Sequence, residues 1–359
     1  MSKQNEIQEK FITKGLSFLK KNKKGYFDLA MRFGKCRTTI EILKNLVPSR
    51  STILIAYPDN KLKATWQSEC ETWGYKNPNI FYVNFSSLKK HATHIFDVFV
   101  IDELHSCSEN EREYAHQIMN NCEYTIGLSG TITADTAELW DMKEIASYST
   151  DDGIKAGILA DYKITVHVVN LDNKIYTKDS KGKSKTEKQR YDAYTWVIEK
   201  LKKEGRDFMF LALTRNRLSQ SSVGKLHYVQ ALLEKLKDKR VLVFTGLSKA
   251  ADSIGIPSYH TKSKNDDAFV AFQNEEINHL ALAAMGKVGV TYPHLDSVIL
   301  TNFVYAAEEN AQILNRCIKL DYQEKVADMH VICLNEPAEI KKLKEGLSLL
   351  DSSKIIWQY

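Results

Sequence analysis

The chain has 359 residues, of which 43% are hydrophobic and 26% charged, with 16 glycines and 6 prolines. This composition is ordinary for a folded chain with two domains, and it excludes a mainly disordered protein. The formal net charge of +5 is too small to identify a nucleic-acid-binding protein by itself. Three lysine-rich clusters, at residues 20–24, 178–190 and 235–240, are as compatible with solvated surfaces as with phosphate contacts.

The cysteines and the N-terminus exclude other classes of protein. The 6 cysteines form no CxxC pair, and no histidine lies at metal-ligand spacing, which argues against a zinc site or a disulfide framework. The N-terminus lacks the apolar core of a signal peptide, and no apolar run approaches the roughly 18 residues of a membrane span. We therefore expect a cytoplasmic protein that does not contact a membrane.

The first half of the chain alternates between strand-like and helix-like segments. A helical pattern over residues 7–19 precedes an apolar stretch at 26–31, and the pair Gly34-Lys35 then opens a helical pattern that runs to residue 46. A helix is predicted over residues 60–73, and a further helical stretch is expected between residues 131 and 157. The predicted strands are 51–58, 79–85, 95–102 and 123–128.

A second series of strands and helices follows the GILADY sequence at residues 157–162. We place the boundary there, which predicts a first lobe over 1–160 and a second over 161–359. The lysine-rich segment 179–188 is predicted to be an exposed loop, and the wider segment 178–190 is predicted to contact the substrate. The fold class is α/β, with two tandem lobes, each a mostly parallel sheet flanked by helices. The predicted strands of the second lobe are 163–169, 208–212, 241–244, 280–283, 297–300 and 330–334.

Residues 29–39, LAMRFGKCRTT, place a glycine-lysine pair at the start of a helix. There the lysine ammonium can lie among phosphates while the first helical amides supply further donors. The usual GxxxxGK[ST] pattern would have glycine at Leu29 and serine or threonine at Cys36. On its own, this segment is as compatible with an ordinary strand-to-helix turn as with a phosphate site.

The segment VIDELH, residues 100–105, ends a buried strand with two adjacent carboxylates. In open α/β sheets, ligands lie at the carboxyl ends of the strands. Asp102 can hold Mg²⁺ there, and Glu103 can orient or deprotonate an attacking water. A solvated acidic pair at a strand end is the simpler alternative, but it is less expected downstream of a strand, a glycine-lysine loop and a helix.

These segments resemble, in order and through nearly the whole chain, the motifs of superfamily 2 helicases of the DExH type. Gly34-Lys35 is similar to motif I, residues 102–105 to motif II and residues 129–131 to motif III. The resemblance implies two RecA-like lobes, with motifs I to III in the first and IV to VI in the second, and it implies ATP and Mg²⁺ as cofactors. The implied ATP-contacting residues are Gln8, Arg32, Phe33, Gly34, Lys35, Cys36, Arg37 and Gly289.

Other segments resemble the parts of these enzymes that contact nucleic acid and couple it to hydrolysis. Residues 55–69 are similar to motif Ia, 84–90 to the segment before motif II, 241–246 to motif IV and 287–293 to motif V. The implied phosphate contacts are Pro58, Lys61, Ser87, Thr245, Gly246 and Thr291. For Lys61, Ser87 and Thr245, a helix surface or loop capping is the alternative.

Coupling between hydrolysis and lobe movement is implied for His105, Ser129 and Thr131. A histidine after a strand is as often a simple hydrogen-bonding residue, so that interpretation of His105 stays open. Trp66 and Trp73 lie seven residues apart on one predicted helix, and this spacing is typical of a stripe that packs against the core.

Residues 311–321, AQILNRCIKLD, are similar to motif VI, QxxGRxxR, whose cations reach the bound ATP from the second lobe. Its polar positions are taken by Gln312, Arg316 and Lys319. Lys319 replaces an arginine and loses the planar fork that can hold two phosphate oxygens. Cys36 and Arg32 replace a Mg²⁺-contacting hydroxyl and a loop glycine. These departures suggest slower turnover, but the retained Lys35, Asp102, Glu103, Gln312 and Arg316 favour an active enzyme.

Within the superfamily, the short chain and the DELH, SGT and GILADY sequences most resemble compact bacteriophage helicases of the branch-migration and recombination type. This implies an ATP-dependent DNA helicase or translocase, monomeric on single-stranded, forked or branched DNA, in replication, recombination or repair. It also implies the host cytoplasm as the location and replication or recombination proteins as partners. Three alternatives stay open: an ATP-gated nucleic-acid clamp with weak hydrolysis, the motor subunit of a restriction or nuclease assembly, and an RNA helicase.

Overall fold

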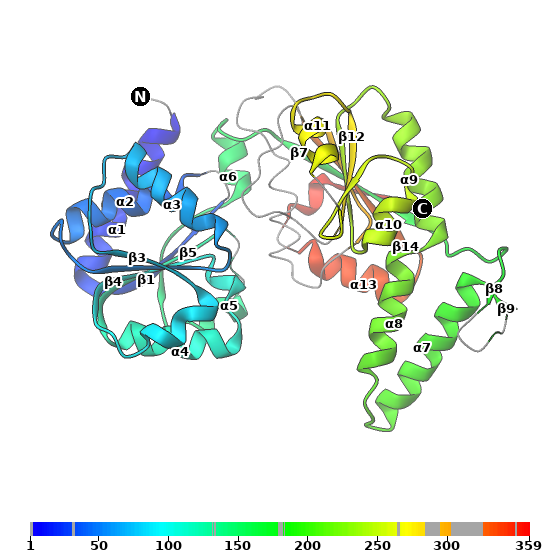
Figure 1. Ribbon diagram of the computed structural model, residues 1–359, viewed down its shortest axis with the longest axis horizontal. Coiled ribbons are helices and arrows are strands. Elements are labelled where there is room, and N and C mark those ends of the chain that lie inside the picture. Colours follow the sequence, from blue (N-terminus) through cyan, green and yellow to red (C-terminus); the bar gives the residue numbers. More distant parts are fainter. Residues whose placement is uncertain are drawn as a thin grey trace. The chain divides into compact units, whose positions relative to one another are not determined.

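Two parallel β-sheets organise the chain in its computed structural model (Figure 1). The structure describes residues 3–30, 33–130, 132, 134–178, 182, 184–263, 266–283, 295–302, 326–348 and 350–359. The chain divides into two compact units, the first ending at Ala160 and the second beginning at Asp161. Each unit carries one of the two sheets.

The first unit is a six-stranded sheet in the order β3-β2-β4-β5-β1-β6, with every neighbouring pair parallel. Its strands are β1 (Lys24–Leu29), β2 (Ile53–Tyr57), β3 (Ile80–Asn84), β4 (Phe96–Asp102), β5 (Cys122–Ser129) and β6 (Lys143–Tyr148). Its α-helices are α1 (Lys3–Asn22), α2 (Lys35–Leu46), α3 (Lys61–Thr72), α4 (Glu109–Asn120), α5 (Ala134–Glu138) and α6 (Thr150–Lys155). Two short 3₁₀ helices, η1 (Phe85–His91) and η2 (Leu104–Ser106), follow β3 and β4.

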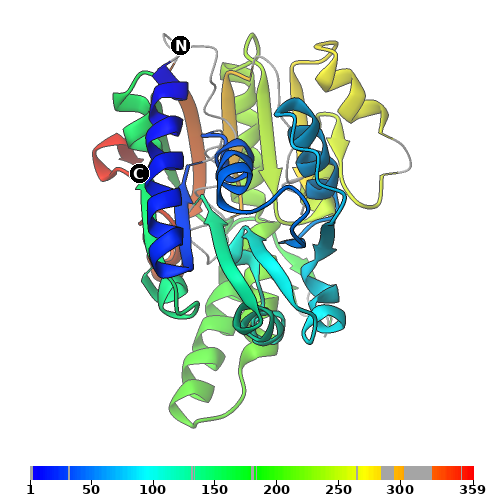
Figure 2. The ribbon, with the colours of Figure 1, turned by 90° about the vertical axis from the view of Figure 1, so that its left-hand side faces the viewer.

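Alternate side chains of the central strands enter two separate cores. On β2, Ile53 and Ile55 pack with α1, α2 and α3, whereas Leu54 and Ala56 pack with α4 and η1. A strand buried on both faces needs a continuous apolar run, and β4, which is buried at six of its seven residues, provides one. The polar residues therefore gather where these strands end. The dark blue helix α1 of Figure 2 packs along α2 and the β1–β6 edge of the sheet.

Strand β6 corrects the sequence analysis, which expected only helix between residues 131 and 157. Its side chains Ile145, Ala146 and Tyr148 are buried, and it pairs in parallel with β1 at the edge of the sheet. The pairing partner lies more than a hundred residues earlier in the chain, so local periodicity carries little information about it.

The second unit is a seven-stranded parallel sheet in the order β11-β12-β10-β13-β14-β7-β15. Its strands are β7 (Tyr162–Val169), β10 (Val241–Thr245), β11 (Ser258–Tyr259), β12 (His279–Ala283), β13 (Ser297–Leu300), β14 (Ala327–Leu334) and β15 (Ile355–Gln358). Its helices are α7 (Glu187–Lys203), α8 (Met209–Gln220), α9 (Val223–Lys235), α10 (Ser248–Ser253), α11 (Asp267–Gln273), α13 (Pro337–Gly346) and η3 (Ser352–Lys354). Strands β8 (Thr177–Lys178) and β9 (Ser184–Lys185) form a separate antiparallel pair.

The strand predicted at residues 208–212 is wrong, because these residues form the start of α8. A short apolar run fits a buried strand and one side of a helix equally well. Here Met209 and Phe210 are 60% and 76% exposed, so the run covers no core in this structure. Helices α7 and α8 form a hairpin that extends away from the sheet of the second unit (Figure 1).

The segment 179–188 departs in part from the predicted exposed loop. Thr186 is fully buried and caps the first turn of α7, and Glu187 is 8% exposed. Residues 179–181 and 183 lie outside the described residues. The five cysteines that the structure describes are free thiols. Among the described residues, we find no helix with the length and apolarity that crossing a membrane requires.

Candidate functional site

The loop between β1 and α2 brings the N-terminal helix to the start of α2. Gly34, the N-cap of α2, has a φ of 96°, in the left-handed region that favours glycine. A Cβ atom at this position would lie 2.2 Å from Nε2 of Gln8, so any other residue would displace that side chain. Phe33 is buried beside it, whereas Arg32 lies outside the described residues.

Gln8 of α1 is 2% exposed and is held by hydrogen bonds at both ends of its amide. Its Nε2 donates to the carbonyl of Phe33, and its Oε1 accepts from Nη1 of Arg37. The Arg37 guanidinium also lies over the Trp73 ring, 4.3 Å from its centroid. Gln8 therefore fastens α1 to the loop that precedes Lys35, and Trp73 supports an arginine as well as the core.

Lys35 and Glu103 form an ion pair across the carboxyl edge of the sheet. Nζ of Lys35 lies 2.5 Å from Oε1 of Glu103, and both side chains are largely buried, with exposed fractions of 13% and 14%. Burial alone would lower the pKa of Lys35, but the carboxylates of Glu103 and Asp102 outweigh it and raise that pKa. The ammonium therefore stays charged in a dry site.

Asp102 ends β4 and is 3% exposed. Burial raises the pKa of its carboxyl to about 6, although the neighbouring Lys35 acts in the opposite direction. Its Oδ2 accepts a hydrogen bond of 2.9 Å from the indole Nε1 of Trp66, a fully buried residue of α3. Its Oδ1 is buried and has no hydrogen-bond partner among the described residues.

An oxygen ligand with an unused lone pair is what Mg²⁺ requires, and the unpartnered Oδ1 of Asp102 fits that requirement. Cys36, on the first turn of α2, does not. Burial and the nearby Asp102 raise the pKa of the Cys36 thiol well above its usual value, so the sulfur stays protonated. A neutral thiol is a poor ligand for a hard cation.

Glu103, His105 and Ser129 connect the ends of β4 and β5. Glu103 has a φ of 59°, an uncommon left-handed conformation for a residue other than glycine. Nδ1 of His105 lies 2.8 Å from Oγ of Ser129 and 3.6 Å from Oε2 of Glu103. The second nitrogen of the ring, Nε2, lies 3.1 Å from Oγ of Ser106. The third residue predicted to couple the lobes, Thr131, lies outside the described residues.

The ends of β2 and β3 hold the residues predicted to contact phosphates in the first unit. Pro58 follows β2, Lys61 begins α3, and Ser87 lies in η1 after β3. The side chain of Asn84 joins these segments, because its Nδ2 donates to the Pro58 carbonyl at 2.9 Å and its Oδ1 accepts from the Ser86 amide. The sequence analysis missed both Asn84 and the Trp66–Asp102 bond, and no local sequence signal indicates either contact.

In the second unit, the structure describes two of the predicted site residues. Thr245 ends β10 and is buried, with its hydroxyl near the carbonyls of Leu247 and Leu282 at 3.1 and 3.3 Å. Gly246 packs so closely on Asn302 that a Cβ atom would lie 2.7 Å from that side chain. The remaining predicted residues, which are Gly289, Thr291, Gln312, Arg316 and Lys319, lie outside the described residues.

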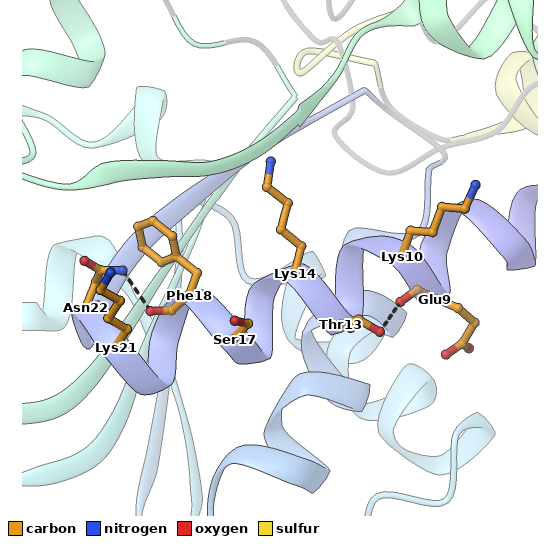
Figure 3. Close-up of a pocket in the computed structure, with 8 residues that line it drawn as sticks. All are labelled: Glu9, Lys10, Thr13, Lys14, Ser17, Phe18, Lys21 and Asn22. Carbon is orange, nitrogen blue, oxygen red and sulfur yellow. Dashed lines mark hydrogen bonds between the residues drawn. The ribbon is translucent and has the colours of Figure 1, made fainter.

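Two of the cavities in the described part of the chain are lined by neither Lys35 nor Asp102. One, of about 730 Å³, is a shallow depression lined by Lys10, Lys14, Phe18 and other residues of α1 (Figure 3). These residues lie on the side of α1 away from the buried Gln8. The other, of about 590 Å³, lies in the second unit between the base of the α7–α8 hairpin, α9, α10 and the end of β10.

No family model and no curated protein sequence matches the chain. Among solved structures, it is similar to the ATP-dependent Type ISP restriction-modification enzyme LlaBIII bound to DNA, with a TM-score of 0.62 and 12% sequence identity. The similarity covers 98% of this chain and 31% of that chain, so this chain spans less than a third of the length of that enzyme. At this identity, the likeness concerns the fold. It confirms the predicted α/β class with two RecA-like lobes, each a parallel sheet flanked by helices.

Proposed function

We propose that the chain is a nucleic-acid-stimulated ATPase that works as a DNA helicase or translocase. The observation that carries the proposal is the joined set of side chains at the carboxyl edge of the first sheet. Lys35 bonds Glu103, His105 lies between Glu103 and Ser129, and the neighbouring Asp102 keeps one oxygen unpartnered. A solvated acidic pair at a strand end would not be buried or paired in this way.

In this proposal, bound ATP with Mg²⁺ supplies the phosphoanhydride bond that is cleaved. Asp102, whose Oδ1 is unpartnered, would hold the metal, while the Trp66 indole donates to its Oδ2. Lys35 would leave Glu103 to neutralise phosphate charge. The freed Glu103 carboxylate would accept a proton from the water that attacks the terminal phosphorus, and ADP would depart as the phosphoanhydride bond breaks. The resemblance implies that Gln8, Phe33, Gly34 and Arg37, which the structure brings together, would contact the nucleotide.

The rest of the motor follows from the resemblance to superfamily 2 helicases. The proposed lobes are 1–160 and 161–359. From the second lobe, Gln312, Arg316 and Lys319 would complete the ATP site, with Gly289 beside the nucleotide. The proposed phosphate contacts are Pro58, Lys61, Ser87, Thr245, Gly246 and Thr291. His105, Ser129 and Thr131 would couple hydrolysis to movement along DNA.

The proposed substrate is single-stranded, forked or branched DNA, which the protein would bind as a monomer in the cytoplasm. Sequence preference should be weak and binding salt-sensitive, because the predicted contacts are to phosphates. Branch migration in phage replication, recombination or repair is the finer form of this proposal.

ATP turnover with and without single-stranded and forked DNA tests the proposal. Lys35→Ala and Glu103→Gln should abolish turnover, whereas Lys44→Ala should not, because Lys44 lies in the last turn of the same helix and pairs with Glu41. A parent protein without turnover, or turnover that survives both site variants, would refute the enzyme. Cys36→Thr restores a hydroxyl and Lys319→Arg restores a guanidinium, so each substitution should accelerate turnover.

The motor subunit of a restriction assembly is the second candidate, favoured by the likeness to part of a Type ISP enzyme. Such a motor would move along duplex DNA and leave cleavage to another chain. Displacement of a third strand from a triplex, without unwinding of a fork, would support it. ATP-dependent binding without displacement in either assay would instead indicate a clamp, and a preference for RNA forks would indicate an RNA helicase.

A further inference from the structure

The α7–α8 hairpin lies between β7 and α9 in the sequence, and Tyr191 and Leu218 are its members in the described core cluster of the second unit. Its two helices are joined by Arg215 of α8, whose Nη1 donates to Oγ1 of Thr195 at 3.1 Å and whose guanidinium lies 5.3 Å from the centre of the Tyr191 ring. Between Glu187 and Gln220 the sequence holds eight basic and five acidic residues. A positively charged hairpin thus accounts for much of the net charge of the chain.

The base of the hairpin is fixed to the sheet. The buried carboxylate of Glu187 accepts hydrogen bonds from the amides of Asp172 and Val223 and from Oγ of Ser222, at 2.9, 3.0 and 3.1 Å. Lys188 adds an ion pair of 2.9 Å with Glu336. These bonds tie the hairpin to the loop after β7, the first turn of α9 and the end of β14. Its position within the second unit is therefore set by buried contacts.

One side of α8 exposes apolar side chains to solvent. Phe210 and Leu213 are 76% and 53% exposed, and Arg217 is exposed as well. Their spacing of three and four residues places them on one face of the helix, away from the Arg215 side that contacts α7. A helix face that contacts only solvent usually carries polar side chains, so the exposed phenylalanine and leucine indicate a surface that binds another molecule.

The same face of α8 leads into the cavity of about 590 Å³. Thr214 and Arg217 line it from α8, Arg190 from α7, Thr245 from the end of β10, and Lys249 from α10. The buried Lys225 also lines it, and its Nζ donates to the carbonyl of Thr301 at 3.0 Å. Basic side chains therefore approach the cavity from four helices, α7, α8, α9 and α10.

The two acidic residues of the cavity already accept hydrogen bonds from backbone amides. Glu187 accepts from Asp172 and Val223, and Oδ1 of Asp172 accepts from the amides of Lys174 and Ile175. Their negative charge is thus partly compensated from within the unit. The site as a whole is suited to an anionic ligand that also carries apolar or aromatic groups.

We infer that the outer face of α8 and this cavity form a binding track for single-stranded DNA. An unpaired base stacks on Phe210, and the strand continues past Arg217 and Lys249, which contact its phosphates, to Thr245. Exposed aromatic rings beside cations bind single strands because every base has a face that can stack. The inference rests on the proposed function and adds to it a surface of α8 and α10 that meets the motif IV segment only at Thr245.

Binding of fluorescein-labelled oligo(dT) to the full chain, followed by fluorescence anisotropy, tests the track. Phe210→Ala should weaken binding between about 5- and 150-fold, the range for loss of one stacked base. Phe210→Tyr keeps a ring and should bind as the parent does. Trp196→Ala is the matched control, because Trp196 is 67% exposed on α7 but does not line the cavity, and its affinity should be unchanged.

Salt dependence tests the phosphate contacts separately. Replacing both Arg217 and Lys249 by alanine should reduce the slope of log affinity against log salt by about 1.4, or about 0.7 for each lost phosphate contact. Circular dichroism should show all variants folded, since Phe210, Arg217 and Lys249 are exposed.

Unchanged affinity in Phe210→Ala and in the double variant would overturn the track. Self-association of the parent that Phe210→Ala abolishes without a change in DNA affinity would also overturn it, and would assign the face to protein contacts. ATP turnover by the parent protein with and without DNA shows whether the track alone fails or the proposed function fails as well. If turnover is present but the track variants bind normally, only the inference fails.

Discussion

Replacement of Trp66 by phenylalanine removes one hydrogen-bond donor from the centre of the first unit. The indole Nε1 donates to Oδ2 of Asp102 at 2.9 Å, and both residues are almost wholly buried. Among the described hydrogen bonds, Trp66 is the only side chain that bonds Asp102. Trp66→Phe therefore leaves a buried carboxylate oxygen without its donor while retaining most of the aromatic packing.

The expected loss of stability depends on pH, because the pKa of Asp102 is raised to about 6 by burial. At pH 8 the carboxylate is charged, and a hydrogen bond to a charged group contributes about 1.5–3 kcal/mol. At pH 5 the carboxyl is mostly protonated, and a neutral hydrogen bond contributes about 0.5–1.5 kcal/mol. The loss at pH 8 should thus exceed the loss at pH 5 by about 1 kcal/mol.

Urea unfolding without metal or nucleotide, followed by circular dichroism at both pH values, measures this difference. Because the chain has two units, the curves should be fitted with two transitions. Trp73→Phe is the control, since its indole bonds the less buried Glu69 on the same helix. Equal losses for Trp66→Phe at pH 5 and pH 8 would refute the assignment of the indole as the donor that stabilises the charged carboxylate.

Three further predictions concern other buried contacts. Ser129→Ala removes the hydroxyl 2.8 Å from Nδ1 of His105, so basal ATP turnover should persist while its stimulation by DNA is lost. An equal loss of basal and stimulated turnover in a steady-state assay would argue against a role of Ser129 in coupling hydrolysis to DNA. Glu187→Ala leaves three donors without their acceptor and should lower the free energy of unfolding of the second unit, measured in urea, by about 3 kcal/mol or more. Substitution of the exposed Glu199 on the same helix by alanine should change this free energy by less than about 0.5 kcal/mol. Burial and the neighbouring His330 lower the pKa of His167 from its ordinary 6.5 to about 4. The neutral ring therefore contributes up to about 3 kcal/mol that is complete above pH 6.5 and is lost as the pH falls toward 4. Unfolding of His167→Phe should depend less on pH over that window, and an unchanged slope would contradict the shift.

Much of the candidate site in the first unit could be predicted, because each of its segments is a short run of consecutive residues. A glycine before a lysine at a helix start, and two acidic residues after a continuous apolar run, each occupy a few consecutive residues. Parallel strands place such residues at a common edge of the sheet, and Lys35 does meet Glu103 there. The positions of Gly34, Lys35, Asp102 and Glu103 thus followed from periodicity and strand order.

The partners of these residues could not be predicted in the same way. Trp66 has the spacing of a packing residue, and it does pack, but its indole also bonds a carboxylate 36 residues away. Asn84, similarly, joins the ends of β2 and β3 through a side-chain bond to the Pro58 carbonyl. A hydrogen bond depends on the direction in which two side chains meet, and pattern along the chain does not encode that direction.

The sequence by itself determined the α/β alternation, most of the central strands and the placement of polar residues after β1 and at the end of β4, because apolar periodicity and motif order are local properties. Only the tertiary structure decided that β6 joins the edge of the first sheet and that residues 208–212 belong to a helix. An edge strand is specified by a distant neighbour, and a short apolar run fits either element until its surroundings show whether it is covered. Because α8 leaves Phe210 exposed, that run became a candidate binding surface instead of part of a core.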